Sequence, residues 1–153
     1  MNDELRRSEN RFRALTQNLS DLVTLLGADG TVKYESPSIK RILGYRPEEQ
    51  LGENAFDVVH PEDLGRTQGK SADGLANSDL RPSVEYRFRH KDGSWRYLES
   101  VGGNLLGDPE VGELVGNSRD TTERKRMEEW LRQAEAKYRA LVERMLAPYI
   151  SRN

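Results

Sequence analysis

The sequence contains no cysteine, and this absence excludes several kinds of chemistry at once. Without a thiol there is no cysteine nucleophile, no disulfide bond and no cysteine-ligated metal. Histidine occurs only at His60 and His90, whereas a metal site usually needs three or four convergent ligands. The residues form no recognisable catalytic constellation. We therefore predict neither an enzyme nor a metal site.

The chain also lacks an excess of charge and a long apolar run. Its 153 residues include 24 basic and 26 acidic side chains, so no global field attracts nucleic acid or an acidic membrane. No hydrophobic stretch approaches the roughly 20 residues of a membrane span. The charged start, Met1 to Glu4, is unlike a signal peptide. These features predict a soluble, cytoplasmic protein without nucleic-acid binding or membrane insertion.

The two ends of the chain carry similar segments, ENRFRAL at 9–15 and EAKYRAL at 135–141. Around both, apolar residues recur at alternating spacings of three and four, which is typical of a coiled-coil seam. We expect an N-terminal flanking helix over 1–19 and a C-terminal helix over 121–147 that leads toward a following module. Pairing of these helices would give a homodimer; alternatively, both helices pack on their own domain. The predicted seam residues are Leu5, Phe12, Leu15, Leu19, Met127, Leu131, Ala134, Tyr138, Leu141 and Met145.

The body, residues 20–120, begins with a strand-like pattern. Two β-rich runs flank Asp29-Gly30, a dipeptide that favours a hairpin turn. Ser36 offers an N-cap oxygen and Gly44 can end a helix in the left-handed conformation, which predicts a short helix over 37–43.

Two further segments are helical candidates of different quality. Pro47 and the two glutamates after it predict a short helix that Gly52 ends. Residues 64–81 have apolar spacings that suggest a helix, but three glycines weaken that pattern. From the residues alone, 64–81 is the softest part of the body, either a mobile lid or a loop.

A strand meander follows. Residues 83–89 alternate between apolar and charged side chains, and Asp92-Gly93 predicts a turn into a second strand that ends near Leu106. A third strand, ELVGNSRD, leads directly into the C-terminal helix. Because isolated hairpins cannot bury an apolar face, we expect one antiparallel sheet covered by the short helices, an α+β fold.

Taken together, these segments resemble the PAS domain, a sensory module of bacterial multidomain signalling proteins. The resemblance covers roughly residues 9–130 and rests on a series of motifs in the family's order: SPSIKRILGYRPEEQLG, HPED, RFRHKDGSWRYLES and NSRDTTERKRMEE. It implies a five-stranded antiparallel sheet of order 2-1-5-4-3 with short helices on one face, and a long helix after HPED. It also implies adjacent PAS or output domains in the same chain.

The resemblance also assigns a signalling junction. In the family, the aspartate at the end of the last strand pairs with an arginine four residues on, which implies an Asp120–Arg124 clamp with Thr121 as a local hydrogen-bonding partner. The family triplet usually has isoleucine in its middle, whereas here two threonines follow Asp120. This difference is expected to loosen packing at the junction.

A ligand cavity between sheet and helices is a further implication, with a filled core as the equal alternative. The candidate lining residues are Leu25, Ile39, Ile42, Leu43, Asn54, Phe56, Val59, Tyr86, Phe88, Leu98, Val115 and Asn117. The cysteinyl-flavin chemistry of the light-sensing branch is excluded because cysteine is missing. Haem is disfavoured because residues 64–81 contain no histidine. No cofactor is predicted, and a small metabolite or a non-covalent flavin remains open.

Two functions fit this reading. The first is a dimeric sensor that relays a signal through its C-terminal helix to an output domain, such as a histidine kinase or a cyclic-dinucleotide enzyme. The second is a ligand-free spacer that only dimerises and relays within a tandem array. Recovery of a bound small molecule would favour the first.

Overall fold

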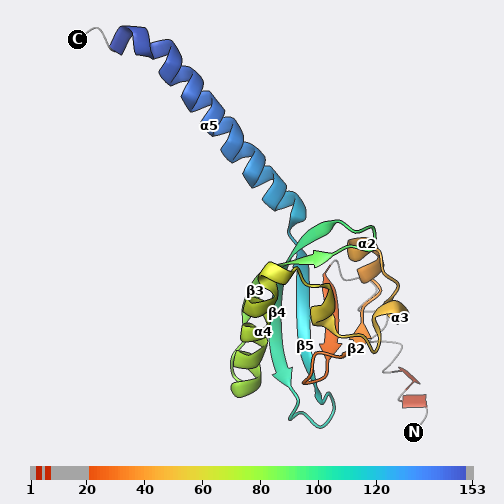
Figure 1. Cartoon of the computed structure of the whole chain (residues 1–153). Coiled ribbons are helices and arrows are strands. Elements are labelled where there is room, and N and C mark those ends of the chain that lie inside the picture. Colours follow the sequence, from red (N-terminus) through yellow and green to blue (C-terminus); the bar gives the residue numbers. More distant parts are fainter. Residues whose placement is uncertain (1–2, 5, 8–20, 151–153) are drawn as a thin grey trace. The chain divides into compact units, whose positions relative to one another are not determined.

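A five-stranded antiparallel sheet forms the centre of the fold, with the order β2-β1-β5-β4-β3 (Figure 1). This is the predicted α+β sheet of order 2-1-5-4-3, which is confirmed. The strands are β1 (Leu22–Leu26), β2 (Val32–Glu35), β3 (Ser83–Arg89), β4 (Trp95–Leu105) and β5 (Glu113–Asp120).

The computed structural model describes residues 3–4, 6–7 and 21–150. It divides the chain into two units, 1–121 and 122–153, which are described separately below. Of the expected N-terminal helix over 1–19, the four described residues are helical and the rest lies outside the described residues. The predicted seam positions Leu5, Phe12, Leu15 and Leu19 also lie outside the described residues.

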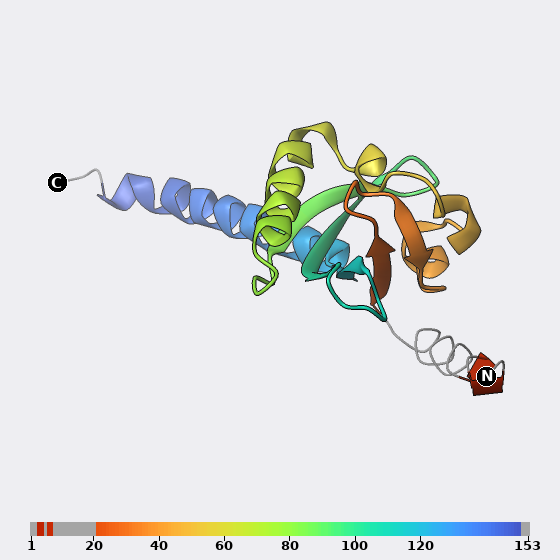
Figure 2. The same cartoon turned by 90° about the horizontal axis from the view of Figure 1, so that it is seen from below.

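Short helices cover one face of the sheet (Figure 2). They are α2 (Ile39–Leu43), α3 (Pro47–Gln50), the 3-10 helix η1 (Ala55–Val58) and the longer α4 (Pro61–Ala76). Gly44 ends α2 with a φ of +83°, as predicted. The predicted N-cap is wrong, because the Ser36 hydroxyl accepts a hydrogen bond from the Val23 amide (2.9 Å) and α2 begins two residues later than expected.

The segment after His60 corrects the residue-level expectation of a soft loop. It forms the 16-residue helix α4, as the family resemblance implied, in spite of its glycines. His60 caps the helix, since its Nδ1 accepts a hydrogen bond from the Glu62 amide (3.1 Å). Asp63, in the first turn, binds both the amide and the guanidinium of Arg87 on β3 at 2.8–3.0 Å. The cap and this ion pair offset the low helix propensity of glycine.

The hydrophobic core lies between α2 and the sheet. Leu43 and Ile39 are almost completely buried there against Leu98 of β4. The remaining buried members of the cluster are Leu22, Ile42, Val59 and Phe88. Because the core occupies only part of the space between sheet and helices, it leaves room for the cavity described below.

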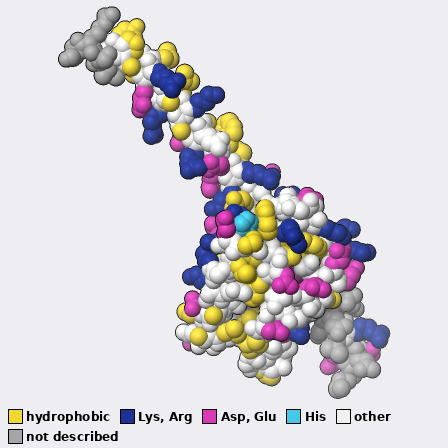
Figure 3. All heavy atoms as spheres, in the orientation of Figure 1, with side chains coloured by type: hydrophobic (Ala, Val, Ile, Leu, Met, Phe, Trp, Pro, Cys, Tyr) yellow, Lys and Arg dark blue, Asp and Glu magenta, His cyan; other side chains and the backbone are white. Residues whose placement is uncertain are grey.

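The second unit is the helix α5 (Thr122–Ile150), whose 29 residues correspond to a length of about 43 Å. It extends three residues beyond the predicted end at 147 and includes Pro148 in its last turn. Apolar side chains are exposed along much of its length (Figure 3). In the described part of the chain, no helix is both long and apolar enough for a membrane span.

Candidate functional site

A cavity of about 150 Å³ lies between the inner face of the sheet and the helices η1 and α4. Its wall is mostly apolar and is built from all five strands, with Phe56 of η1 and Gly74 of α4 on the opposite side. In another protein, a cavity of about this volume accepts benzene. The fold therefore offers room for a group the size of one aromatic ring.

The cavity exists partly because two facing positions of the sheet have no side chain. Gly102 of β4 pairs directly with Gly116 of β5, and both residues line the cavity. A Cβ atom added at Gly116 would meet nothing closer than the Thr24 carbonyl oxygen at 3.9 Å. The glycine pair thus leaves space that larger residues would fill.

One wall of the cavity carries a buried carboxyl group, that of Glu35 at the end of β2. The residue is only 6% exposed, and Thr24 Oγ1 donates a hydrogen bond of 2.5 Å to its Oε1 atom. Burial raises the pKa of Glu35 to about 7, although the Thr24 hydrogen bond acts in the opposite direction. No ion pair of Glu35 is found among the described residues.

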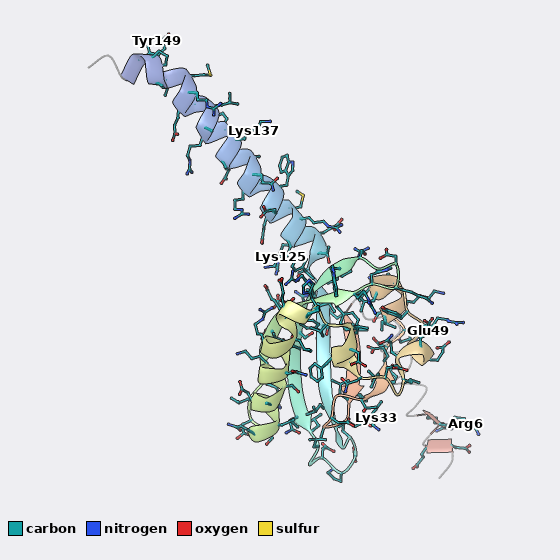
Figure 4. All side chains as sticks on the ribbon, viewed as in Figure 1. Arg6, Lys33, Glu49, Lys125, Lys137 and Tyr149 are labelled. Atoms are coloured by element: carbon teal, nitrogen blue, oxygen red, sulfur yellow. The ribbon has the colours of Figure 1, made fainter. Side chains whose placement is uncertain are left out.

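A β-bulge is the reason why Glu35 points inward. Leu25 pairs with Tyr34, but Leu26 pairs with Val32, so Lys33 is an extra residue in β2. Strict alternation would place Glu35 on the opposite face from Val32. With the bulge, both residues are buried and both line the cavity, while Lys33 (labelled in Figure 4) is exposed.

Three hydroxyl groups form a chain along another wall. The Tyr86 hydroxyl lies 2.7 Å from Ser100 Oγ, which lies 2.6 Å from Ser118 Oγ. All three residues line the cavity, and burial raises the pKa of Tyr86 above its ordinary value. The cavity therefore combines an apolar wall with a few convergent polar groups, a composition typical of small-molecule sites.

The predicted cavity residues fall into three groups. Phe56, Val59, Tyr86, Phe88 and Val115 line the cavity. A second group, Ile39, Ile42, Leu43 and Leu98, belongs to the packed core and is absent from the cavity wall. The third group, Leu25, Asn54 and Asn117, is also absent from the wall.

Alternation and local hydrogen bonding explain the third group. Leu25 and Asn117 lie between wall residues of their strands, so their side chains belong to the other face of the sheet. Asn54 caps η1 by accepting a hydrogen bond from the Phe56 amide, and its amide group donates to the Asp29 carbonyl. Glu35, Thr24 and Ser100 were missing from the predicted set.

The predicted signalling junction lies where β5 ends. Asp120 pairs with Leu98 in the sheet, and the Thr121 amide donates a hydrogen bond to the Tyr97 carbonyl at 2.8 Å. Within α5, Arg124 Nε lies 3.8 Å from Glu128 Oε1. The Asp120–Arg124 clamp would join the two units and stays a prediction.

No metal centre is found among the described residues. In that part of the chain, no group of three acidic or histidine side chains lies close enough together to hold an ion. The cluster of charges at the start of α4 instead holds the helix in place. Arg87 binds Asp63 and also Glu62 (3.0 Å), which fixes the helical wall of the cavity against β3.

Comparisons with known proteins agree with this architecture. The family model described as the PAS fold matches residues 32–107. The PAS domain of an HTR-like protein from Haloarcula marismortui superposes with a TM-score of 0.64 at 27% identity, covering 78% of this chain and 96% of that structure. The chain belongs to the PAS family.

Two further relatives are similar to this chain, one in structure and one in sequence. A sensory box histidine kinase/response regulator from Burkholderia thailandensis has a TM-score of 0.61 and 28% identity, covering 85% of this chain and 98% of that structure. White collar 2 protein of Neurospora crassa is 35% identical over 100 residues, which are 65% of this chain and 18% of that protein. This PAS chain spans less than a fifth of the length of White collar 2 protein and of two further curated relatives.

Proposed function

We propose that this PAS domain is a dimeric sensor that binds a small metabolite in its cavity and relays binding to an output domain through α5. The output domain would be a histidine kinase or a cyclic-dinucleotide enzyme in the same chain, with adjacent PAS domains as further neighbours. The domain itself would act by binding and would catalyse no reaction.

One observation carries this proposal: the strand that lines the cavity leads directly into the helix that would signal. Gly116 and Ser118 of β5 line the cavity, and only Thr121 separates the end of β5 from the start of α5. A ligand that displaces β5 therefore acts on the residues that set the start of α5. This change can switch α5 between two states only if α5 has a partner helix against which it shifts.

The surface of α5 supports such a partner. The predicted seam residues Met127, Leu131, Tyr138, Leu141 and Met145 are each at least 50% exposed, and Ala134 lies among them. Lys137 and Tyr149 also project outward from the helix (Figure 4). A helix with an exposed apolar stripe of this spacing is stabilised by pairing with a second helix. We infer a parallel homodimer in which two copies of α5 pack along this seam.

The experiment that tests the proposal has two parts. Sedimentation equilibrium of the whole chain and of residues 1–121 should show a dimer that is lost without α5. In a full-length parent protein, Asp120→Ala should change the output while the circular dichroism spectrum of the domain stays the same. Unchanged output would refute the clamp, and a monomeric whole chain at high concentration would refute the relay.

The alternative function, a ligand-free spacer, has to be distinguished from a sensor. Mass spectrometry of small molecules released from the purified, denatured protein separates the two functions. A recovered stoichiometric compound supports sensing. An intact dimer with responsive output, but no ligand and no effect of filling the cavity, would make the domain a spacer.

A further inference from the structure

We propose that the cavity binds a small primary amine, whose ammonium group pairs with Glu35 and whose apolar part is about the size of one aromatic ring. This inference rests on the proposed ligand-binding function and adds the chemical class of the ligand. It is carried by the position of one carboxyl group in the cavity wall and by the absence of a cation beside it in the described part of the chain.

The carboxyl group of Glu35 differs from that of Asp63, the other acid that is buried among the described residues. Asp63 is also nearly buried, but it binds Arg87 and lies 3.3 Å from Arg66. Glu35 has the Thr24 hydroxyl on one oxygen and, among the described residues, no cation within ion-pair distance. Buried carboxylates are stable when paired. A ligand with an ammonium group supplies the missing charge.

The other titratable groups on the cavity wall do not replace that ligand. Tyr86 of β3 is uncharged near pH 7, because the ordinary pKa of a tyrosine is 10.0 and burial raises the pKa of Tyr86 further. Lys70 of α4 is exposed, and it makes no ion pair with Glu35. Gln50 of α3 and Thr24 of β1 are polar but uncharged. The hydroxyls of the wall can accept the remaining hydrogen bonds of an ammonium group.

The volume of the cavity indicates the size of the group that it can surround. A volume of about 150 Å³ holds one ring with a short arm. The glycine pair Gly102 and Gly116 and the rings of Phe56 and Phe88 offer an apolar surface for such a body. A single-ring or similarly sized aliphatic amine therefore matches both the charge and the space.

Three probes of nearly equal size test the inference on the whole chain. Benzylamine carries the ammonium group, benzyl alcohol is its neutral counterpart, and benzoate carries the opposite charge. Binding is followed by chemical-shift changes in ¹H–¹⁵N spectra at pH 6 and pH 8. The affinity for benzylamine should rise about tenfold between these values, because Glu35 loses its proton in this range. Benzyl alcohol should show no such rise, and benzoate should bind most weakly at pH 8.

Three variants locate the binding. Glu35→Gln should lower the affinity for benzylamine at pH 8 about tenfold or more while it keeps the affinity for benzyl alcohol, which also shows that the cavity is intact. Glu48→Gln, on the exposed side of α3, is the matched control and should bind as the parent chain does. Gly116→Val should abolish binding of both probes, because its side chain fills the cavity.

The inference is overturned if benzylamine does not bind at pH 8, if it binds no more tightly than benzyl alcohol, or if Glu35→Gln leaves its affinity unchanged. These measurements require neither α5 nor a dimer. A chain that dimerises and relays without taking up benzylamine leaves the proposed function intact and removes only the amine. A chain that binds benzylamine but stays monomeric does the reverse.

Discussion

Thr24 and Glu35 are direct neighbours across the β1–β2 pair, and the threonine hydroxyl donates a hydrogen bond of 2.5 Å to the glutamate carboxyl. A single hydroxyl does not offset the cost of burying a carboxylate, so burial dominates and the pKa of Glu35 rises to about 7. The carboxyl therefore gains and loses its proton in the physiological range.

The stability of the domain should fall as this carboxyl ionises. Its pKa is raised from 4.5, so the folded state keeps a proton that the unfolded state releases as pH rises from about 4.5 to 7. The stabilising contribution of the protonated form is complete below pH 4.5 and is lost above pH 7. Glu35→Gln lacks this loss, so its unfolding free energy relative to the parent should increase by about 2–3 kcal/mol from pH 4.5 to pH 8. Urea titrations at both pH values measure it, and a difference as flat as that of Glu48→Gln would contradict it.

The ion pair of Asp63 predicts the opposite pH dependence in acid. Hydrogen bonds from Arg87 hold the pKa of Asp63 at about 2, below its ordinary 3.8, although burial acts against them. The stabilisation is present above pH 3.8 and is lost as pH falls toward 2. Asp63→Asn should lower the unfolding free energy by roughly 2 kcal/mol at pH 7 and by much less at pH 2. Asp73→Asn, exposed on the same helix, is the control. Equal pH profiles for both variants would show that the ion pair contributes nothing.

The glycines of α4 differ in the free space beside them, so substitution by alanine should stabilise the domain at some positions and not at another. A Cβ atom at Gly65 or Gly69 meets no atom within 4 Å, whereas at Gly74 it would lie 3.3 Å from Pro82 Cγ. Gly65→Ala and Gly69→Ala should each raise the unfolding free energy by about 0.5–1 kcal/mol, because alanine loses less backbone entropy in a helix. Gly74→Ala should gain less or lose stability. Thermal unfolding compares the three, and equal effects at all positions would contradict the role of Pro82.

The same substitution, alanine to aspartate, at two nearby positions of α5 tests the predicted seam. Ala134 lies on the predicted seam, and Ala136 lies on the opposite, exposed side. Ala134→Asp buries two like charges in the dimer and should raise its dissociation constant about tenfold or more. Ala136→Asp changes helix propensity equally but should leave the dimer intact. Analytical ultracentrifugation measures both constants, and equal weakening would place the interface elsewhere.

Local patterns in the sequence were sufficient for most of the sheet. The alternation of Val84, Tyr86 and Phe88 and the turn at Asp92-Gly93 predicted β3 and β4, because period and turn chemistry are properties of short segments. Helix α4 was different. Its glycines lowered the local signal, and the Asp63–Arg87 contact that holds it joins residues 24 positions apart. Such a contact cannot be read from a local pattern.

The cavity was predictable only in part for the same reason. Apolar residues of the sheet and helices were expected to face each other, but which of them pack and which leave space depends on shape. Ile39 and Leu98 meet in the core, whereas the missing side chains of Gly102 and Gly116 open the cavity. Glu35 was missed because ordinary strand alternation does not include the extra residue Lys33.

That extra residue also determines what a shorter β2 would do. If Lys33 were deleted, Val32 and Glu35 would stand two residues apart, so regular pairing with Leu26 and Thr24 would keep both side chains inward. A single-codon deletion at this point would therefore straighten the β1–β2 pair and leave the acid in the cavity wall. Related domains with a β2 shorter by one residue should accordingly keep an inward side chain opposite Thr24.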